Sequence, residues 1–116
     1  MRLPDWPERL AALITAAEQR PFEAARWNCA RLARAAVEAV TGCRPSWRHG
    51  PTLATMADTA GFPRVPVPFA RAGDVVLAAD PDRLGVVLDA GRTAFVGPAG
   101  LLRAPITACA IAWRIG

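Results

Sequence analysis

The sequence predicts an α+β fold in which about three N-terminal helices precede a four- to five-stranded antiparallel sheet. Apolar residues recur at helical spacing in the first half, and short β-rich runs separated by turn signals fill the second. With 116 residues, 53% of them hydrophobic, the chain can bury one core. We therefore expect a single domain over 1–116, with a helical half at about 4–61, a Pro-rich connector at 62–70 and a sheet half at 73–115.

The central segment of the helical half, residues 22–42, is predicted to form one helix with a cysteine in its first turn. Its start is marked by Asn28, whose side-chain oxygen can accept from free amides of the first turn, and its end by Gly42. The polar face carries Arg31, Arg34 and Glu38. The apolar face has the i, i+3, i+4, i+7 spacing of a buried stripe: Cys29, Leu32, Ala33, Ala36, Val37 and Val40.

Shorter helices are predicted on either side. The first begins after Asp5, a candidate N-cap, and ends near Arg20, before Pro21. The last begins after Thr52 and runs through Ala60. Their apolar stripes should face the core: Trp6, Leu10, Leu13, Ile14 and Ala17 in one, and Leu53, Met56, Ala57 and Ala60 in the other.

The connector contains the sequence FPRVPVPF at 62–69. Its prolines argue against a helix or a central strand and favour an extended link at the surface; a recognition segment is the alternative. An antiparallel meander should follow, with turns rich in Gly, Pro and Asp between its strands. The predicted strands are 75–79, 84–88, 92–96, 101–104 and, after a brief turn, part of 107–115.

The charge pattern restricts the partners. The net charge is +4, and every basic residue is an arginine. These arginines are scattered singly, without alternating aromatics, so nucleic acid is not a favoured partner. No apolar run approaches the ~18–20 residues of a membrane span. The N-terminus lacks the apolar core of a signal peptide, so we expect synthesis in the cytosol.

Metal and cofactor signals are weak. The three cysteines, Cys29, Cys43 and Cys109, have no metal-site spacing, and His49 is the only histidine. Neither a disulfide framework nor a cofactor is expected.

The acidic residues around the strand ends do not form a recognisable motif either. Asp80, Asp82 and Asp89 lack the pattern of a calcium loop and are expected to be solvated turn residues. Asp74, which follows Gly73, is expected to cap a turn.

Cys29 allows two interpretations. A cysteine in the first turn of a helix lies near the positive end of the helix dipole, which favours a reactive thiolate. A cysteine on an apolar helix face also serves as a small core residue.

Five stretches resemble a family of phage and prophage proteins of about this length, the DUF6950 family. They are LPDWPERLAALI at 3–14, PF…C…AAVEAVTG at 21–42, GFP…P…FARAGDVVL at 61–77, LGVV at 84–87 and AWRI at 112–115. The order of a cysteine-bearing helix, a Gly-Asp strand and an antiparallel sheet is also similar to the cell-wall cysteine peptidases of the NlpC/P60 type. The resemblance implies a papain-like layout.

The peptidase resemblance places Cys29 at the nucleophile position. Asn28 replaces the aspartate that usually precedes the nucleophile, Arg83 falls where the catalytic histidine is expected, and Phe95 falls near the residue that orients it. Arginine stays protonated at neutral pH and cannot serve as the base. His49, in the loop that follows the central helix, is an alternative partner for Cys29.

Two functions follow from the resemblance. The first is a structural or adaptor protein of a phage or prophage particle, in the tail, built on a degenerate hydrolase fold. Its partners would be other phage structural proteins, contacted through 62–69 or through the 43–51 loop with Trp47 and Arg48; it would reside in the virion, or in the host cytoplasm during assembly. The alternative is a cysteine hydrolase that cleaves peptidoglycan with Cys29.

Overall fold

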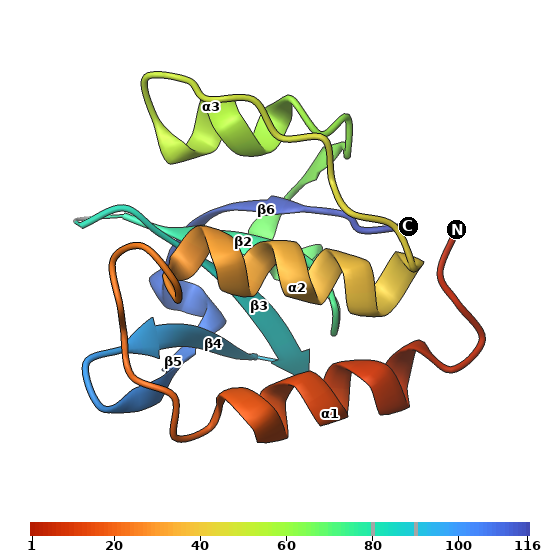
Figure 1. Cartoon of the computed structure of the whole chain (residues 1–116). Helices are drawn as coiled ribbons and strands as arrows, with labels where there is room; N and C mark the ends of the chain where they lie inside the picture. The colour runs from red at the N-terminus through yellow and green to blue at the C-terminus, as the bar shows by residue number, and fades with distance from the viewer. Residues whose placement is uncertain (80, 90) are drawn as a thin grey trace.

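The computed structural model describes residues 1–79, 81–89 and 91–116. These residues form three α-helices, which lie on one side of a single antiparallel sheet (Figure 1). The helices are α1 (Trp6–Ala17), α2 (Cys29–Thr41) and α3 (Leu53–Asp58). The strands are β1 (Arg64–Val65), β2 (Val75–Ala78), β3 (Arg83–Asp89), β4 (Arg92–Gly97), β5 (Gly100–Pro105) and β6 (Cys109–Trp113). The predicted α+β class and the three N-terminal helices are confirmed.

The sheet has six strands, in the order β1-β6-β2-β3-β4-β5, instead of the four or five predicted. The additional strand, β1, lies inside the Pro-rich connector and pairs with β6 at the sheet edge, where prolines are tolerated. Only β2 to β5 form a meander, because β6 returns to lie between β1 and β2. The connector also contains a short 3-10 helix, η1 (Val67–Phe69), although its prolines argue against a regular helix.

The capping predictions for α2 are confirmed. The Asn28 side chain accepts a hydrogen bond of 3.0 Å from the Arg31 amide. Gly42 closes the helix in the left-handed region at φ 78°, with its amide bonded to the Glu38 carbonyl. The buried side of α2 packs on β3 and carries Leu32, Ala33, Ala36, Val37, Ala39 and Val40.

The starts of α1 and α3 differ in how well they were predicted. Thr52 forms a reciprocal capping box with Thr55, as its position suggested. Asp5 makes no side-chain capping bond, because its backbone (φ −99°, ψ 22°) is not in the extended conformation typical of an N-cap. The first helix also ends at Ala17, earlier than predicted.

Side chains of the sheet alternate between two packed faces. Val75 and Leu77 point to the helices, whereas Val76 and Ala78 point to the opposite side. There, side chains of η1 and of a second 3-10 helix, η2 (Ile106–Ala108), pack against the core. The sheet is therefore covered by α-helices on one face and by short 3-10 turns on the other.

Asp74 was predicted to cap a turn, and it does accept a 3.0 Å bond from the Arg71 amide. Its carboxylate is also fully buried and joins the two ends of the chain. Oδ1 accepts from the Arg2 guanidinium and from the Ile115 amide, and Oδ2 accepts from Arg114 Nε, each at 3.0 Å. No local pattern in the sequence indicated these distant partners.

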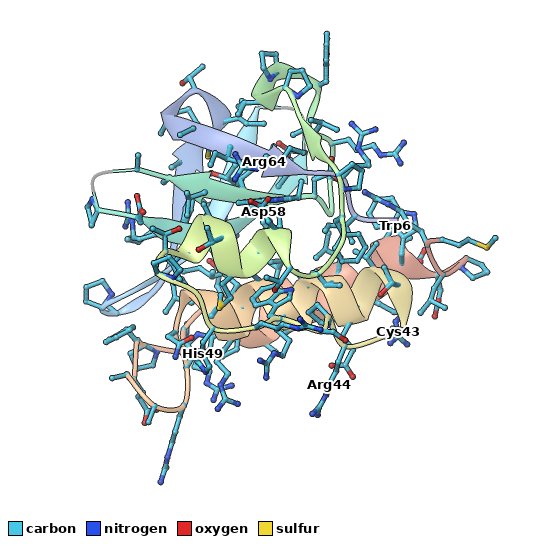
Figure 2. The ribbon with its side chains drawn as sticks, turned by 90° about the horizontal axis from the view of Figure 1, so that it is seen from above. Trp6, Cys43, Arg44, His49, Asp58 and Arg64 are labelled. Carbon is cyan, nitrogen blue, oxygen red and sulfur yellow. The ribbon has the colours of Figure 1, made fainter. Side chains whose placement is uncertain are left out.

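Asp58 connects α3 to the sheet edge (Figure 2). Its Oδ1 accepts from Arg64 Nε at 2.9 Å and from Trp113 Nε1 at 2.8 Å, while its Oδ2 accepts from Arg64 Nη2 at 2.7 Å. The hydrogen bonds from Arg64, followed by that from Trp113, lower the pKa of Asp58. Asp58 thus holds α3 over β6 and β1.

We expect this lowered pKa to make the fold less stable in acid. Because the folded pKa of Asp58 lies below the unfolded one, its contribution is complete above about pH 4 and is lost as pH falls through the folded value. The side chain is 40% exposed, so the contribution is at most about 1 kcal/mol. Urea unfolding from neutral to acidic pH should show a shallower loss in Asp58→Asn than in the wild type. Identical pH profiles would contradict the assignment.

Candidate functional site

Cys29 is the first residue of α2 and is half-buried. Its side chain packs against the core cluster that includes Ala33, Val37 and Leu84. No hydrogen bond joins the Cys29 thiol to another side chain of the described residues. The structure therefore gives Cys29 the packing expected of a small core residue, while leaving part of it accessible at the helix start.

Arg83, at the position of the expected histidine, begins β3. Its guanidinium lies over the ring of Phe95, 5.3 Å from the ring centroid, and its buried Nε has no hydrogen-bond partner among the described residues. Phe95 also covers Gly85: a Cβ added at Gly85 would lie 2.6 Å from the ring. The positions that the resemblance assigned to a base and its orienting residue thus form a cation–π contact.

His49 is brought close to the start of α2 by the loop that follows this helix (Figure 2). An open pocket of about 250 Å³ forms there. Its lining residues are Asn28, Ala30, Arg31, Arg34, Trp47, His49 and Met56. The structure therefore gathers His49 and the first turn of α2 at one site, although no hydrogen bond joins His49 to Cys29.

The 43–51 loop, through which partners were expected to bind, holds Trp47 and Arg48 in different surroundings. Trp47 is half-buried and packs against the core cluster that contains Val37 and Trp113. Arg48 remains exposed, and its amide donates to Thr59 Oγ1 at 2.8 Å. Trp47 therefore anchors the loop to the core, with only part of its surface available to a partner.

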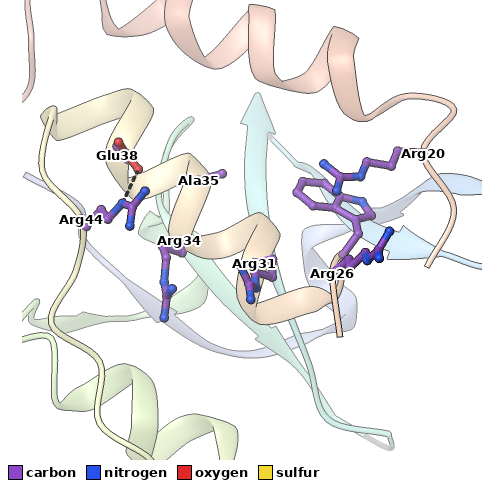
Figure 3. Close-up of a pocket in the computed structure, with 8 residues that line it drawn as sticks. Arg20, Arg26, Arg31, Arg34, Ala35, Glu38 and Arg44 are labelled. Carbon is purple, nitrogen blue, oxygen red and sulfur yellow. Dashed lines mark ion pairs between the residues drawn. The ribbon is translucent and has the colours of Figure 1, made fainter. Parts of the chain in front are cut away.

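A second pocket, of about 260 Å³, lies along the exposed side of α2 (Figure 3). Five arginines line it, and we call it the arginine pocket: Arg20, Arg26, Arg31, Arg34 and Arg44, with Trp27, Ala35 and Glu38. The residues come from α2 and from the loops before and after it. Arginines that are scattered in sequence are thus concentrated in space, and only the i, i+3 spacing of Arg31 and Arg34 indicated this.

The remaining predicted residues do not join either pocket. Asp82 is exposed, Asp89 pairs with Arg92 at 2.6 Å, and Asp80 lies outside the described residues. All three cysteines are free thiols, and burial raises the pKa of Cys109 on the opposite face of the sheet.

Two general properties of the described residues complete the site description. They contain no group of three or more His, Cys, Asp or Glu side chains placed to hold a metal ion. In the same part of the chain, no helix has both the length and the apolar character required to cross a bilayer.

The fold and the site define a small α+β protein whose central helix exposes an arginine-rich surface beside a half-buried cysteine. A family model described as "Domain of unknown function (DUF6950)" matches residues 1–57 and 46–115. Because these matches together span almost the whole chain, the protein belongs to the DUF6950 family. The resemblance found in the five sequence stretches is confirmed for this family. A comparison with curated proteins finds no match.

Proposed function

We propose that this protein is a non-catalytic structural or adaptor component of a phage or prophage particle, in the tail, on a papain-like fold that has lost hydrolase chemistry. The phage assignment comes from the resemblance of the five sequence stretches. The papain-like assignment is supported by the packing of α2, with Cys29 in its first turn, against the antiparallel strand β3.

The contact between Arg83 and Phe95 is the main observation that supports a non-catalytic role. A positioned base contributes about 10²–10⁴ in rate, which corresponds to roughly 3–5 kcal/mol. An arginine cannot supply this contribution, because it holds its proton at neutral pH. The start of an exposed helix contributes only about 0.3–1 kcal/mol to a nearby charge. The position at which the resemblance expects the base therefore provides Cys29 with no proton acceptor.

Asn28 supports the same conclusion. Its side chain accepts from the Arg31 amide and donates to the Ala24 carbonyl at 2.9 Å, so both ends of the amide are occupied in holding the helix start. An adaptor requires a rigid surface of this kind, whereas a thiol nucleophile requires an adjacent group that accepts a proton.

Particles from the host that carries the gene provide the direct test. A tagged copy should co-purify with intact particles and be located on the tail by antibody labelling in electron micrographs. Deletion of the gene should reduce the yield of tailed particles, and Cys29→Ser should restore that yield as well as the wild type. A protein that is absent from purified particles would refute the structural assignment.

A cysteine hydrolase of peptidoglycan is the second candidate, favoured by the pocket that places His49 beside the first turn of α2. We expect purified protein to release no fragments from dye-labelled peptidoglycan. Release that is abolished by Cys29→Ser and by His49→Ala, but retained by the neighbouring Arg48→Ala, would establish this alternative. Alkylation of Cys29 in the folded protein, faster than that of free cysteine, would contradict a packing role.

A further inference from the structure

We propose that the arginine pocket binds the phosphodiester backbone of duplex nucleic acid. This binding activity goes beyond the adaptor function and does not depend on it. The pocket extends along the exposed side of α2, opposite the face that packs on the sheet (Figure 3).

The first support is the number of cations available in one place. Arg44 forms a 3.6 Å ion pair with Glu38. Within the described residues, no carboxylate lies within ion-pair distance of the pocket's other four arginines: Arg20, Arg26, Arg31 and Arg34. Arginines elsewhere in the chain commonly have acidic partners: Arg2, Arg64, Arg92, Arg103 and Arg114. Of the eight arginines that form no ion pair with the described residues, four therefore line this one surface.

The second support is the ordered loop that carries two of these cations. The Arg20 guanidinium stacks on Trp27, 4.3 Å from the ring centroid, and Trp27 is only 6% exposed. Two backbone hydrogen bonds of 2.8 Å between Glu23 and Trp27 fix the intervening turn, which includes Arg26. A stacked guanidinium keeps its N–H edge free for bidentate contact with a phosphate.

The pocket composition favours nucleic acid over a protein partner. The energetic centre of a protein interface is usually an accessible aromatic or aliphatic anchor. In this pocket the aromatic side chain, Trp27, is buried beneath Arg20, and the accessible groups are mainly guanidinium. Phosphate contacts require only such donors. The absence of an exposed ring among the described lining residues favours a duplex over a single strand, which binds by stacking on aromatics.

Fluorescence anisotropy with a labelled DNA duplex of arbitrary sequence tests the proposal. Four phosphate contacts predict a slope of log Kobs against log salt of about −3 to −4, so a fourfold rise in salt should weaken binding roughly 100-fold. Arg31→Gln/Arg34→Gln should halve that slope and leave roughly a 10-fold effect. A second double variant, Arg20→Gln/Arg26→Gln, changes the loop that precedes α2 and leaves the helix unaltered. It should reduce the salt dependence of binding by a similar amount.

The matched control is Arg71→Gln/Arg92→Gln, which removes two exposed charges outside the pocket. It should retain the wild-type slope, and circular dichroism should show that all three variants remain folded. Three results would overturn the proposal: no DNA binding at low salt, an equal loss in the control, or tighter binding of polyglutamate than of DNA. The last result would identify an acidic protein as the occupant.

Discussion

Replacing Asp74 with alanine is expected to lower the free energy of unfolding by about 3–5 kcal/mol, the usual loss when a buried charge network loses one partner. The Asp74 side chain is fully buried, and the Arg2 side chain is only 10% exposed. Without the carboxylate, the Arg2 charge and the buried Ile115 amide lose an acceptor. Burial already lowers the pKa of Arg2 against the opposing effect of Asp74. Urea unfolding followed by circular dichroism measures the loss.

Asp74→Asn separates charge from shape. An asparagine has one oxygen acceptor, so it cannot accept at both positions that now bind Arg2 and Arg114, and it should lose most of the same stability. Asp89→Ala is the control, because Asp89 and Arg92 form an exposed ion pair, and such pairs contribute little to the free energy of unfolding. Equal urea midpoints for the Asp74 and Asp89 variants would show that the buried network contributes little to the free energy of unfolding.

The same network shows which features of the fold the sequence can predict. Caps at Asn28, Gly42 and Thr52 were predictable because each acts on residues three or four positions away. Asp74 was recognised only as a turn residue, since its bond to the Arg71 amide is local. Its contacts with Arg2 cross most of the chain and leave no periodic pattern.

The predicted number of strands was wrong for a related reason. The strand β1 has two residues, flanked by prolines, and exists because β6 offers it a partner: Arg64 pairs with Trp113 and Val65 with Ala112. Neither length nor composition marks such a strand. A local pattern also could not place β6 between β1 and β2, because that order depends on long-range pairing.

The candidate site was predictable as a set of residues but not as an arrangement. Cys29 was correctly placed in the first turn of a helix, and Arg83 at the start of a strand. The stack of Arg83 on Phe95 depends on the pairing of β3 with β4, and the arginine pocket depends on loops that return to α2. Both arise from tertiary packing, and only the i, i+3 spacing of Arg31 and Arg34 gave a local indication of the pocket.

Trp113→Ala should also destabilise the protein by about 3–5 kcal/mol, the usual cost of deleting a buried tryptophan side chain. Trp113 is 1% exposed and lies in the core cluster that joins α2 and α3 to the sheet. It also pairs with β1 on one side and β2 on the other. The cavity would therefore weaken the packing of α2 and α3 on the sheet and the pairing of β6 with its two neighbouring strands. Chemical denaturation should show the loss, whereas Phe69→Ala, at a 70% exposed position, should change stability by less than about 0.5 kcal/mol.

Trp113→Phe distinguishes packing from hydrogen bonding at the same position. The smaller ring retains much of the apolar contact but cannot donate to Asp58, which then keeps only its bonds from Arg64. We expect a loss of about 1–2 kcal/mol, composed of one hydrogen bond and some packing. Amide exchange should increase first in α3 and β1, because Asp58 joins these elements to β6. A uniform increase across β2 to β4 would instead mean that Trp113 supports the whole core and that α3 is not held through Asp58.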